Sequence, residues 1–237
     1  MPFPNPIQRI RSFFALEWIG DDDLYLQAFS SITPSLLVGR RPTPDHLDTL
    51  SAKGVTHVVS CLEEQRRTDV AFLGDDFDHL FLPANDEMNH DLDDAIERFL
   101  SWVDDARATD SNATVLVHCE VGVSRSASLA IALLMRDDGR TFLDAFELAR
   151  SRRVQVLPNL AFASQLQHLE HRLQPTQRTA TPSSLAVYLR RHCSAPAEVD
   201  ELQAALEQHD FDAPAALRSI YGGEIPRVVQ GARSASR

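Results

Sequence analysis

The chain has 237 residues, of which 43% are hydrophobic, and it carries a formal net charge of −11 at pH 7. That size allows one substantial core with a small appended module. An acidic surface repels nucleic-acid backbones and anionic membranes, so we expect neither as a partner. A locally positive anion site built from backbone amides and arginines remains compatible with this charge.

The three cysteines, Cys61, Cys119 and Cys193, are far apart and show no CxxC pairing. This spacing argues against a zinc site and a disulfide scaffold, and it favours a reducing, cytoplasmic location. No apolar stretch reaches the length that spans a bilayer. The segment 6–23 holds a short apolar patch without a small-residue cleavage site, which favours an amphipathic packing segment over a signal peptide.

Taken in chain order, short apolar or β-branched runs predict strands at 32–38, 55–61, 77–83 and 113–119. Capped or amphipathic segments predict helices at 43–54, 91–106, 125–139 and 142–153, and another after Pro158-Asn159. Strands that alternate with helices predict an α/β fold, in which helices pack on a central sheet.

The composition changes after residue 173, where a polar, proline-containing stretch indicates a linker. Two or three short amphipathic helices follow within 183–221. They form either a partner-binding module or helices that pack back on the main domain, and we favour the second because such short helices are unstable alone. We therefore predict an N-terminal extension, a main domain, a linker, a helical extension and a mobile tail, with bounds 1–30, 31–174, 175–182, 183–224 and 225–237.

One stretch, VLVHCEVGVSRSAS at 115–128, places a cysteine, a five-residue loop and an arginine between an apolar strand and an apolar helix. A tight loop of this kind turns backbone N–H groups inward, and the helix start adds free N–H groups and partial positive charge. Gly122 allows backbone conformations closed to other residues. Arg125 offers a planar fork that holds two phosphate oxygens. The pattern predicts an anion site of phosphate size.

Cys119 stands at the edge of this predicted site. The field that binds phosphate also favours a thiolate, so we expect a lowered pKa and a cysteine that attacks phosphorus to form a phosphocysteine. Ser124 and Ser126 supply hydroxyls near the sulfur, and His118 is expected to orient the loop. Cys-x5-Arg alone is a weak motif, and a cysteine at a strand end is usually an inert core residue. The strand, glycine, serines and helix together favour the functional interpretation.

The segment HCEVGVSRS (118–126) closely resembles the signature of dual-specificity protein phosphatases, a compact branch of the cysteine-based protein tyrosine phosphatase superfamily. The likeness runs from about Ile32 to Leu173 and includes ITPSLLVG, KGVTHVVSC and the closing segment VQVLPNLAFASQLQHLE. The resemblance implies a mixed central sheet flanked by helices, with 31–174 as the catalytic domain.

By the same resemblance, Cys119 would be the nucleophile, Arg125 the phosphate ligand and Ser126 the residue that assists breakdown of the intermediate. The other residues of the loop would bind the substrate: Glu120, Val121, Gly122, Val123 and Ser124. This chemistry requires no metal and no cofactor, and we expect none.

A proton donor is needed when an alkoxide or phenoxide leaves phosphorus. The loop-like stretch 82–92 lies at a strand end, where α/β sites are built. Asp86 falls where the family's general acid falls, after a strand and before a helix. Glu87 and Asp91 are rivals, but Asp91 is explained as the N-cap of the next helix and Glu87 as a solvated carboxylate.

Val121 and Val123 would give the approach to the site an apolar character, as in phosphatases that act on phosphoproteins. Packing beneath the loop explains them equally well. Arg152 and Arg153 either extend positive potential toward the site or cap the C-terminal end of their helix, and we favour the second interpretation.

Cys61 ends a strand that should lie beside the strand of Cys119. Some relatives carry a second cysteine near this place, which protects an oxidised nucleophile as a disulfide. Cys61 is thus a candidate redox partner, although a small buried hydrophobic residue is the favoured interpretation. Cys193 lies outside the matched region and receives no role. Arg40 and Arg41 are as ambiguous as the later arginine pair.

The leading hypothesis is hydrolysis of phosphotyrosine, together with phosphoserine or phosphothreonine, in cytoplasmic phosphoproteins. A non-protein substrate is the first alternative: a phosphoinositide, a lipid phosphate or an RNA 5′-phosphate. The two valines of the loop and the acidic charge argue against it mildly. A phosphoprotein-binding domain is the second alternative, which the presence of Cys119 and Arg125 disfavours. A protein partner is also conceivable at 183–221.

Overall fold

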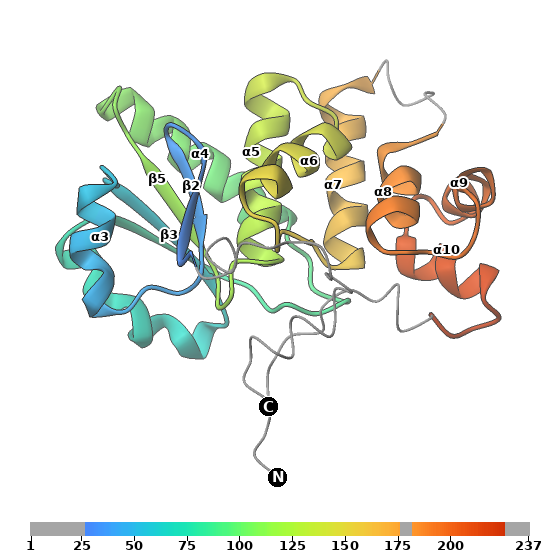
Figure 1. Ribbon diagram of the computed structural model, residues 1–237, viewed down its shortest axis with the longest axis horizontal. Helices are drawn as coiled ribbons and strands as arrows, with labels where there is room; N and C mark the ends of the chain where they lie inside the picture. The colour runs from blue at the N-terminus through green and yellow to red at the C-terminus, as the bar shows by residue number, and fades with distance from the viewer. Residues whose placement is uncertain (1–26, 176–181, 226–237) are drawn as a thin grey trace, which may run out of the picture.

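The computed structural model describes residues 27–175 and 182–225 (Figure 1). The expectations for the segment 6–23, for most of the linker and for the tail after 225 concern residues outside these ranges. The predicted α/β architecture is confirmed: a mixed sheet carries helices on both faces, and three further helices follow at the C-terminal end.

The sheet has five strands in the order β1-β2-β5-β3-β4. Their bounds are β1 Phe29–Thr33, β2 Leu36–Gly39, β3 His57–Leu62, β4 Asp78–Pro83 and β5 Val115–His118. β1 and β2 are antiparallel, whereas β2, β5, β3 and β4 run parallel to one another. The prediction of one strand at 32–38 was wrong, because Pro34 and Ser35 form a turn between two strands and proline suits turns.

The helices begin and end near the predicted positions. They are the 3-10 helix η1 Pro44–His46, α3 Leu47–Ala52, the 3-10 segment η2 Glu64–Asp75, α4 Asp93–Thr109, α5 Arg125–Asp138, α6 Phe142–Arg152, α7 Leu160–Leu173, α8 Ser184–His192, α9 Val199–Gln208 and α10 Ala213–Ile220. The side chains of Thr141 and Asn159 cap α6 and α7. Only η2 went unpredicted among these elements, since its sequence lacks the apolar spacing of an α-helix.

The two faces of the sheet bury separate clusters. Alternate residues of a strand point to opposite faces, so Val58 packs in a cluster with Leu50 of α3 and Leu73 of η2. Val59 points the other way, into the larger cluster formed with α4, α5 and α6. In Figure 1, α3 lies on one side of the strands, and α5 to α7 lie on the other.

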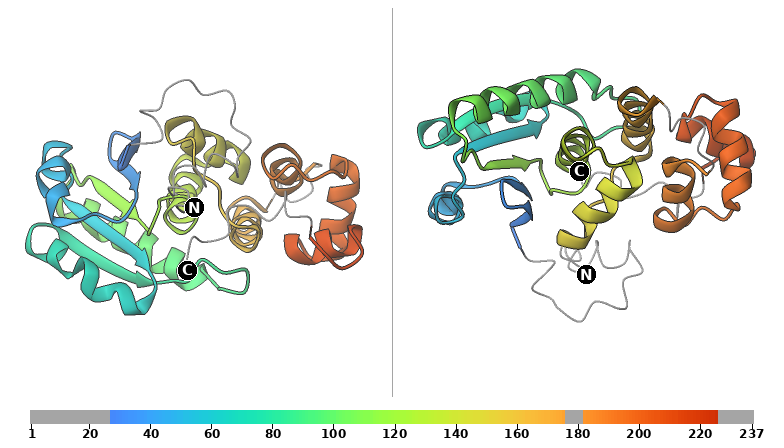
Figure 2. Two further views of the ribbon diagram at one scale, coloured as in Figure 1. Left: turned by 60° about the horizontal axis from the view of Figure 1, so that its bottom comes forward. Right: turned by 90° about the horizontal axis from the view of Figure 1, so that it is seen from above.

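The C-terminal helices pack back on the main domain, which confirms the favoured interpretation of this segment: α8 contacts α6 and α7, α10 contacts α7, and α9 packs on α8 and α10. The ring of Tyr188 contacts Phe142 and Phe146 of α6, with ring centroids 5.2 Å and 4.9 Å away. Buried leucines of these helices belong to the same apolar cluster as α5 and α7. Figure 2 shows this arrangement from two further directions. None of the helices in the described ranges is long and apolar enough to cross a membrane.

Candidate active site

The loop formed by residues 119–125 joins the end of β5 to the start of α5. It lies at the edge where the parallel strands β3, β4 and β5 end, which is the usual place for sites in α/β folds. Gly122 adopts a φ of 78°. A Cβ atom on this residue would stand 2.5 Å from the carbonyl oxygen of Gly39 and 2.7 Å from Nη2 of Arg153, so the loop closes only with glycine here.

The carbonyl groups of the 119–125 loop are held away from its interior. Arg153 donates from Nε to the oxygen of Gly122 at 2.8 Å and from Nη2 to that of Val121 at 3.0 Å. The amide of Leu157 donates to the oxygen of Val123 at 2.9 Å. Because a trans peptide holds its C=O and N–H on opposite sides, the amides that follow these carbonyls point inward. This supplies the row of donors that the sequence predicts.

Cys119 is 2% exposed and lies at the base of the loop. Its sulfur accepts hydrogen bonds from the amide of Gly122 at 3.2 Å and from the hydroxyl of Ser126 at 3.3 Å. Burial alone would raise the pKa of Cys119, but the charge of Arg125 and the hydrogen bonds from Ser126 outweigh burial and lower the pKa below its ordinary value. The arrangement favours a thiolate.

Arg125 is 3% exposed, and its guanidinium faces the same interior. Nη1 donates to the carbonyl of Ala84 at 3.1 Å and to Oε1 of Glu63 at 2.9 Å. Nε is buried without a hydrogen-bond partner, and Oδ2 of Asp86 lies 4.0 Å from it. A buried donor without an acceptor costs free energy, and an anion in the loop would supply the missing acceptor.

The loop before α4 brings Asp86 to the 119–125 loop. Oδ1 of Asp86 accepts hydrogen bonds from the hydroxyl of Ser124 at 2.8 Å and from Nδ2 of Asn159 at 2.9 Å. Of the two rivals, Glu87 is exposed. Asp91 accepts a hydrogen bond from the amide of Asp93 at 2.9 Å, although Leu92 rather than Asp91 occupies the N-cap position of α4.

His118 is fully buried and connects the loop to the sheet. Its Nε2 lies 2.6 Å from the hydroxyl of Ser60, which lies 2.8 Å from Nε2 of His79, and its Nδ1 lies 3.3 Å from the carbonyl of Cys119. Burial lowers the pKa of His118 to about 3, so the ring is neutral at physiological pH. The contacts of His118 thus join the strand β3 to the first residue of the loop.

Two arginines have contacts that the sequence did not settle. The favoured interpretation of Arg153 as a helix cap was wrong: its side chain is buried and binds the 119–125 loop, and burial lowers its pKa to about 10. Its neighbour Arg152 is exposed in the last turn of α6. Arg41 forms an ion pair with Glu120, with Nε 3.1 Å from Oε2. The carboxylate of this loop residue is therefore directed to a protein cation.

Two residues of the site were not predicted. Glu63 follows β3 directly, and Asn159 is the N-cap of α7. The first has a signal that would have found it, because the carboxyl ends of parallel strands meet at one edge of a sheet. Asn159 lies in the closing segment that resembles the family, but the sequence predicted no role for it. Its contact with Asp86 arises only when α7 docks on the site.

Cys61 is fully buried at the end of β3, whose residue Ser60 pairs with His118 of β5. Burial raises the pKa of its thiol, and the charge of nearby Cys119 raises it further. Cys61 fits both interpretations made from the sequence. Peptide mapping after peroxide treatment distinguishes a Cys61–Cys119 disulfide from an oxidised Cys119 beside a free Cys61.

Within the described ranges, no group of three or more metal-ligating side chains is assembled.

Comparison with known proteins agrees with this geometry. Residues 36–172, more than half of the chain, match the dual specificity phosphatase catalytic domain. Dual specificity protein phosphatase 1B of Arabidopsis thaliana is 35% identical over 148 residues, which are 61% of this chain and 83% of that protein. Dual specificity protein phosphatase 5 of Rattus norvegicus is 32% identical over 128 residues, which are 54% of this chain and 33% of that protein.

Solved structures show the same relationship. Human DUSP28 matches with a TM-score of 0.55 and 29% identity, over 62% of this chain and 96% of that one. The human tyrosine phosphatase-like serine/threonine/tyrosine-interacting protein matches with a TM-score of 0.54 and 28% identity, over 60% of this chain and 95% of that one. The chain therefore belongs to the dual-specificity phosphatases of the cysteine-based protein tyrosine phosphatase superfamily, and it is a protein phosphatase.

Proposed function

We propose that the protein hydrolyses phosphotyrosine, and also phosphoserine and phosphothreonine, in proteins through a phosphocysteine intermediate. The observation that carries the proposal is the environment of Cys119. Its sulfur receives two hydrogen bonds, its pKa is lowered, and it shares the interior of the loop with the buried, unpartnered Nε of Arg125. A thiolate beside donors that can hold an anion is the arrangement that phosphoryl transfer to sulfur needs.

Substrate binding follows from the donors of the 119–125 loop. The equatorial oxygens of the phosphoryl group accept hydrogen bonds from the inward amides and from Arg125, whose free Nε then has an acceptor. Glu63 holds the other side of the guanidinium, at Nη1. The phosphorus atom thereby faces the sulfur of Cys119, with the ester oxygen on the opposite side, as an in-line displacement requires.

The reaction has two steps. In the first, the thiolate of Cys119 forms a bond to phosphorus, the bond from phosphorus to the ester oxygen breaks, and that oxygen takes a proton from Asp86. In the second, water attacks phosphorus, Asp86 takes a proton from the water, and the sulfur leaves as a thiolate. The hydroxyl of Ser126 donates to this sulfur, which stabilises the departing thiolate.

The substrate class is argued from the surroundings of the loop. Val121 is 38% exposed, so an apolar side chain stands at the entrance. The nearby charge of Arg41 is paired with Glu120. This combination suits a phosphorylated side chain on a protein better than a polyanionic lipid or nucleic acid. The names of the relatives, dual specificity protein phosphatases, point to the same substrates. We place the protein in the cytoplasm, where its three free cysteines stay reduced.

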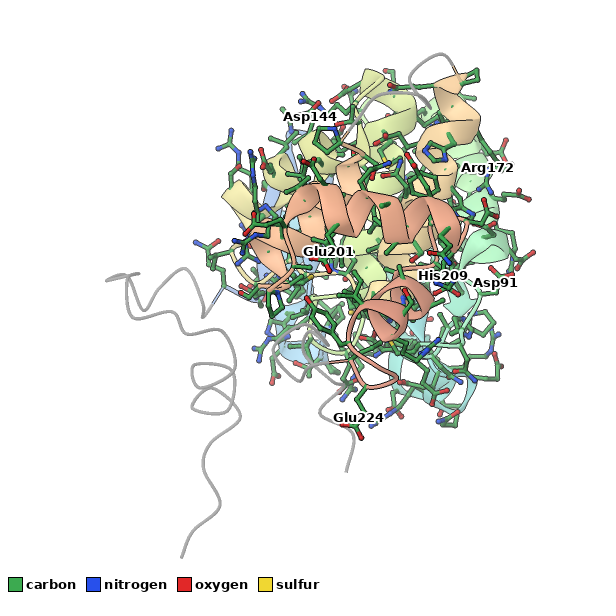
Figure 3. All side chains as sticks on the ribbon, turned by 90° about the vertical axis from the view of Figure 1, so that its right-hand side faces the viewer. Asp91, Asp144, Arg172, Glu201, His209 and Glu224 are labelled. Carbon is green, nitrogen blue, oxygen red and sulfur yellow. The ribbon has the colours of Figure 1, made fainter. Side chains whose placement is uncertain are left out.

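We further propose that the catalytic unit is the predicted domain 31–174. Because β1 begins at Phe29, we extend the N-terminal boundary of this catalytic unit to include the two residues before the predicted start at residue 31. The segment 183–221 stays a candidate surface for a protein partner. Figure 3 looks onto this side of the molecule, where Glu201, His209 and Glu224 are labelled.

A substrate panel tests the proposed function. Wild type and Cys119→Ser are compared on phosphotyrosine, phosphoserine and phosphothreonine peptides, a phosphoinositide and a 5′-phosphorylated RNA. We expect release of phosphate from the peptides by wild type alone. Activity that survives in Cys119→Ser would refute the nucleophile, and preference for the lipid or the RNA would refute the substrate class. Binding of phosphopeptides without turnover by wild type would instead identify a binding domain.

A further inference from the structure

The segment 153–159 lies between the 119–125 loop and the C-terminal helices. On one side it donates four hydrogen bonds to the loop: two from the side chain of Arg153, one from the amide of Leu157 and one from the amide of Asn159 to the hydroxyl of Ser124 at 3.1 Å. A displacement of this segment would therefore move the loop and the residues bound to it.

On its other side, the segment is held by α8. The hydroxyl of Tyr188 donates to the carbonyl of Pro158 at 2.8 Å, and the side chain of Tyr188 is fully buried. Its ring is fixed against Phe142 and Phe146. A tyrosine so enclosed has no freedom to follow a moving partner, so the carbonyl of Pro158 is held at a fixed place. α8 contacts both α6 and α7, and Figure 1 shows it beside α7.

Pro158 precedes the residue that holds the candidate acid. Asn159 donates from Nδ2 to Oδ1 of Asp86 at 2.9 Å, while its own Oδ1 accepts from the amide of Phe162 and caps α7. Ser124 donates to the same Oδ1 at 2.8 Å. With two donors on Oδ1, the proton of the acid form is left to Oδ2, the oxygen that faces Arg125. Asn159 thereby directs the proton of Asp86 toward the place of the substrate.

We propose that Tyr188 and Asn159 are positioning residues, and that α8 is thereby part of the catalytic apparatus rather than an appended module. Tyr188 fixes Pro158, Pro158 fixes Asn159, and Asn159 sets which oxygen of Asp86 carries the proton. The inference rests on the proposed function, because it assumes that Asp86 protonates the leaving group. It assigns to a segment outside the family-like region a contribution to that proton transfer.

The test compares Tyr188→Phe with a matched control, Tyr221→Phe. The hydroxyl of Tyr221 accepts from the amide of Ala197 at 2.9 Å, so the control removes a hydroxyl of the same segment that makes no contact with 153–159. Both variants are assayed with phenyl phosphate, a poor leaving group, and with dinitrophenyl phosphate, a good one. We expect Tyr188→Phe to lower kcat for phenyl phosphate by about fivefold, and to change kcat for dinitrophenyl phosphate by less than about twofold.

Asn159→Ser is the second variant, because serine still caps α7 but cannot reach Asp86 with an amide. It should show the same dependence on the leaving group. In an Asp86→Asn background both effects should disappear, because the acid through which they act is gone. Unfolding midpoints of Tyr188→Phe and Tyr221→Phe are measured alongside, to compare the stability that each loses. Of these two tyrosine variants, we expect only Tyr188→Phe to show the leaving-group dependence.

The outcomes separate the two proposals. If Tyr188→Phe and Asn159→Ser slow both substrates equally, or act unchanged in the Asp86→Asn background, the positioning role is refuted while the phosphatase stands. If Tyr221→Phe shows the same leaving-group dependence, the effect is one of stability and the inference is again refuted. If wild type turns over neither aryl phosphate nor phosphopeptide in a Cys119-dependent way, the proposed function itself fails.

Discussion

Glu63 forms an ion pair with Arg125, with Oε1 2.9 Å from Nη1. The carboxylate follows the end of β3 and the guanidinium begins α5, so the contact joins a strand end to a helix start that are far apart in the sequence. It fixes the plane of the guanidinium before any substrate arrives. An arginine that is already oriented loses less side-chain entropy when it binds phosphate.

This contact predicts the effect of replacing Glu63. Glu63→Ala removes the acceptor that orients Arg125 and should lower kcat/KM for a phosphotyrosine peptide by about tenfold, the effect of about 1.4 kcal/mol. Glu63→Gln retains an acceptor oxygen and should recover most of that loss. Steady-state kinetics of both variants check the prediction. Equal activity of Glu63→Ala and wild type would show that the 119–125 loop alone orients the guanidinium.

Replacement of Asp86 should act on turnover rather than on binding. Asp86→Asn keeps the shape of the side chain but has no proton to give, so kcat for phenyl phosphate should fall by about 100-fold or more. The loss for dinitrophenyl phosphate should be much smaller, since its leaving group needs no proton. Binding of inorganic phosphate serves as the control and should change little. An equal loss for both esters would argue against Asp86 as the acid.

Gly122 should be intolerant of any side chain, for two separable reasons. Gly122→Ala meets both a positive φ and the carbonyl of Gly39, 2.5 Å from the new Cβ, so we expect activity to be lost. Gly54 has a similar φ of 72° with nothing near its Cβ position. Gly54→Ala therefore measures the backbone strain alone, about 1 kcal/mol, and should leave activity intact. Denaturant unfolding and phosphatase assays of the pair check this.

The buried His118 should make folding stability sensitive to acid. Its pKa is about 3 in the folded chain and near 6.5 when unfolded. The unfolded chain therefore binds more protons than the folded chain between these pH values. The contribution of neutral His118 to the free energy of unfolding is complete above about pH 6.5 and decreases as pH falls toward 3. At most it is on the order of 5 kcal/mol.

Denaturant unfolding between pH 7 and pH 5 measures this dependence. Burial also lowers the pKa of His79 and of His192, so wild type is compared with His118→Asn, in which only one of the three titrations is removed. The variant should lose less stability than wild type over this interval. Parallel pH dependence in the two proteins would contradict the assignment.

The shared apolar cluster predicts that the catalytic unit and the C-terminal helices unfold together. Leu217 of α10 is fully buried in a cluster that includes residues of α5 and α7. Leu217→Ala should lower the free energy of unfolding by about 2 to 5 kcal/mol within a single transition, followed alike by circular dichroism and by activity. Arg218→Ala, at an exposed position of the same helix, is the control and should change little. A separate early transition would indicate an independent module.

Much of the fold was predictable because its signals are local. Thr141 and Asn159 cap the helices that follow them, and Gly139 ends α5 in the left-handed conformation expected of a terminal glycine. The hairpin of β1 and β2 was missed because only Pro34 and Ser35 separate the two strands, and the first of them, FSSIT, is largely polar. A turn of two residues leaves little trace in hydrophobic periodicity.

The site was predictable where its residues are contiguous. The spacing of Cys119, Gly122 and Arg125 follows from the geometry of one loop and one helix start, so the sequence predicts their meeting. The partners of Asp86 and Arg125 come from other elements, Asn159 from α7 and Glu63 from β3. Only tertiary docking brings such pairs together. Arg153 was interpreted as a helix cap for the same reason, because its local sequence gives no sign of the distant loop that it binds.

Arg153 contacts residues 27–30 as well as the 119–125 loop. Its Nη1 lies 3.0 Å from the carbonyl of Gln27 and 3.3 Å from the hydroxyl of Ser30. One buried guanidinium thus ties together segments that are synthesised far apart, and it can do so only after β1 and α6 have both docked. Nascent or partly folded chains should accordingly lack phosphatase activity. Enzymatic assay would then serve as a sensitive reporter of complete folding during refolding or synthesis.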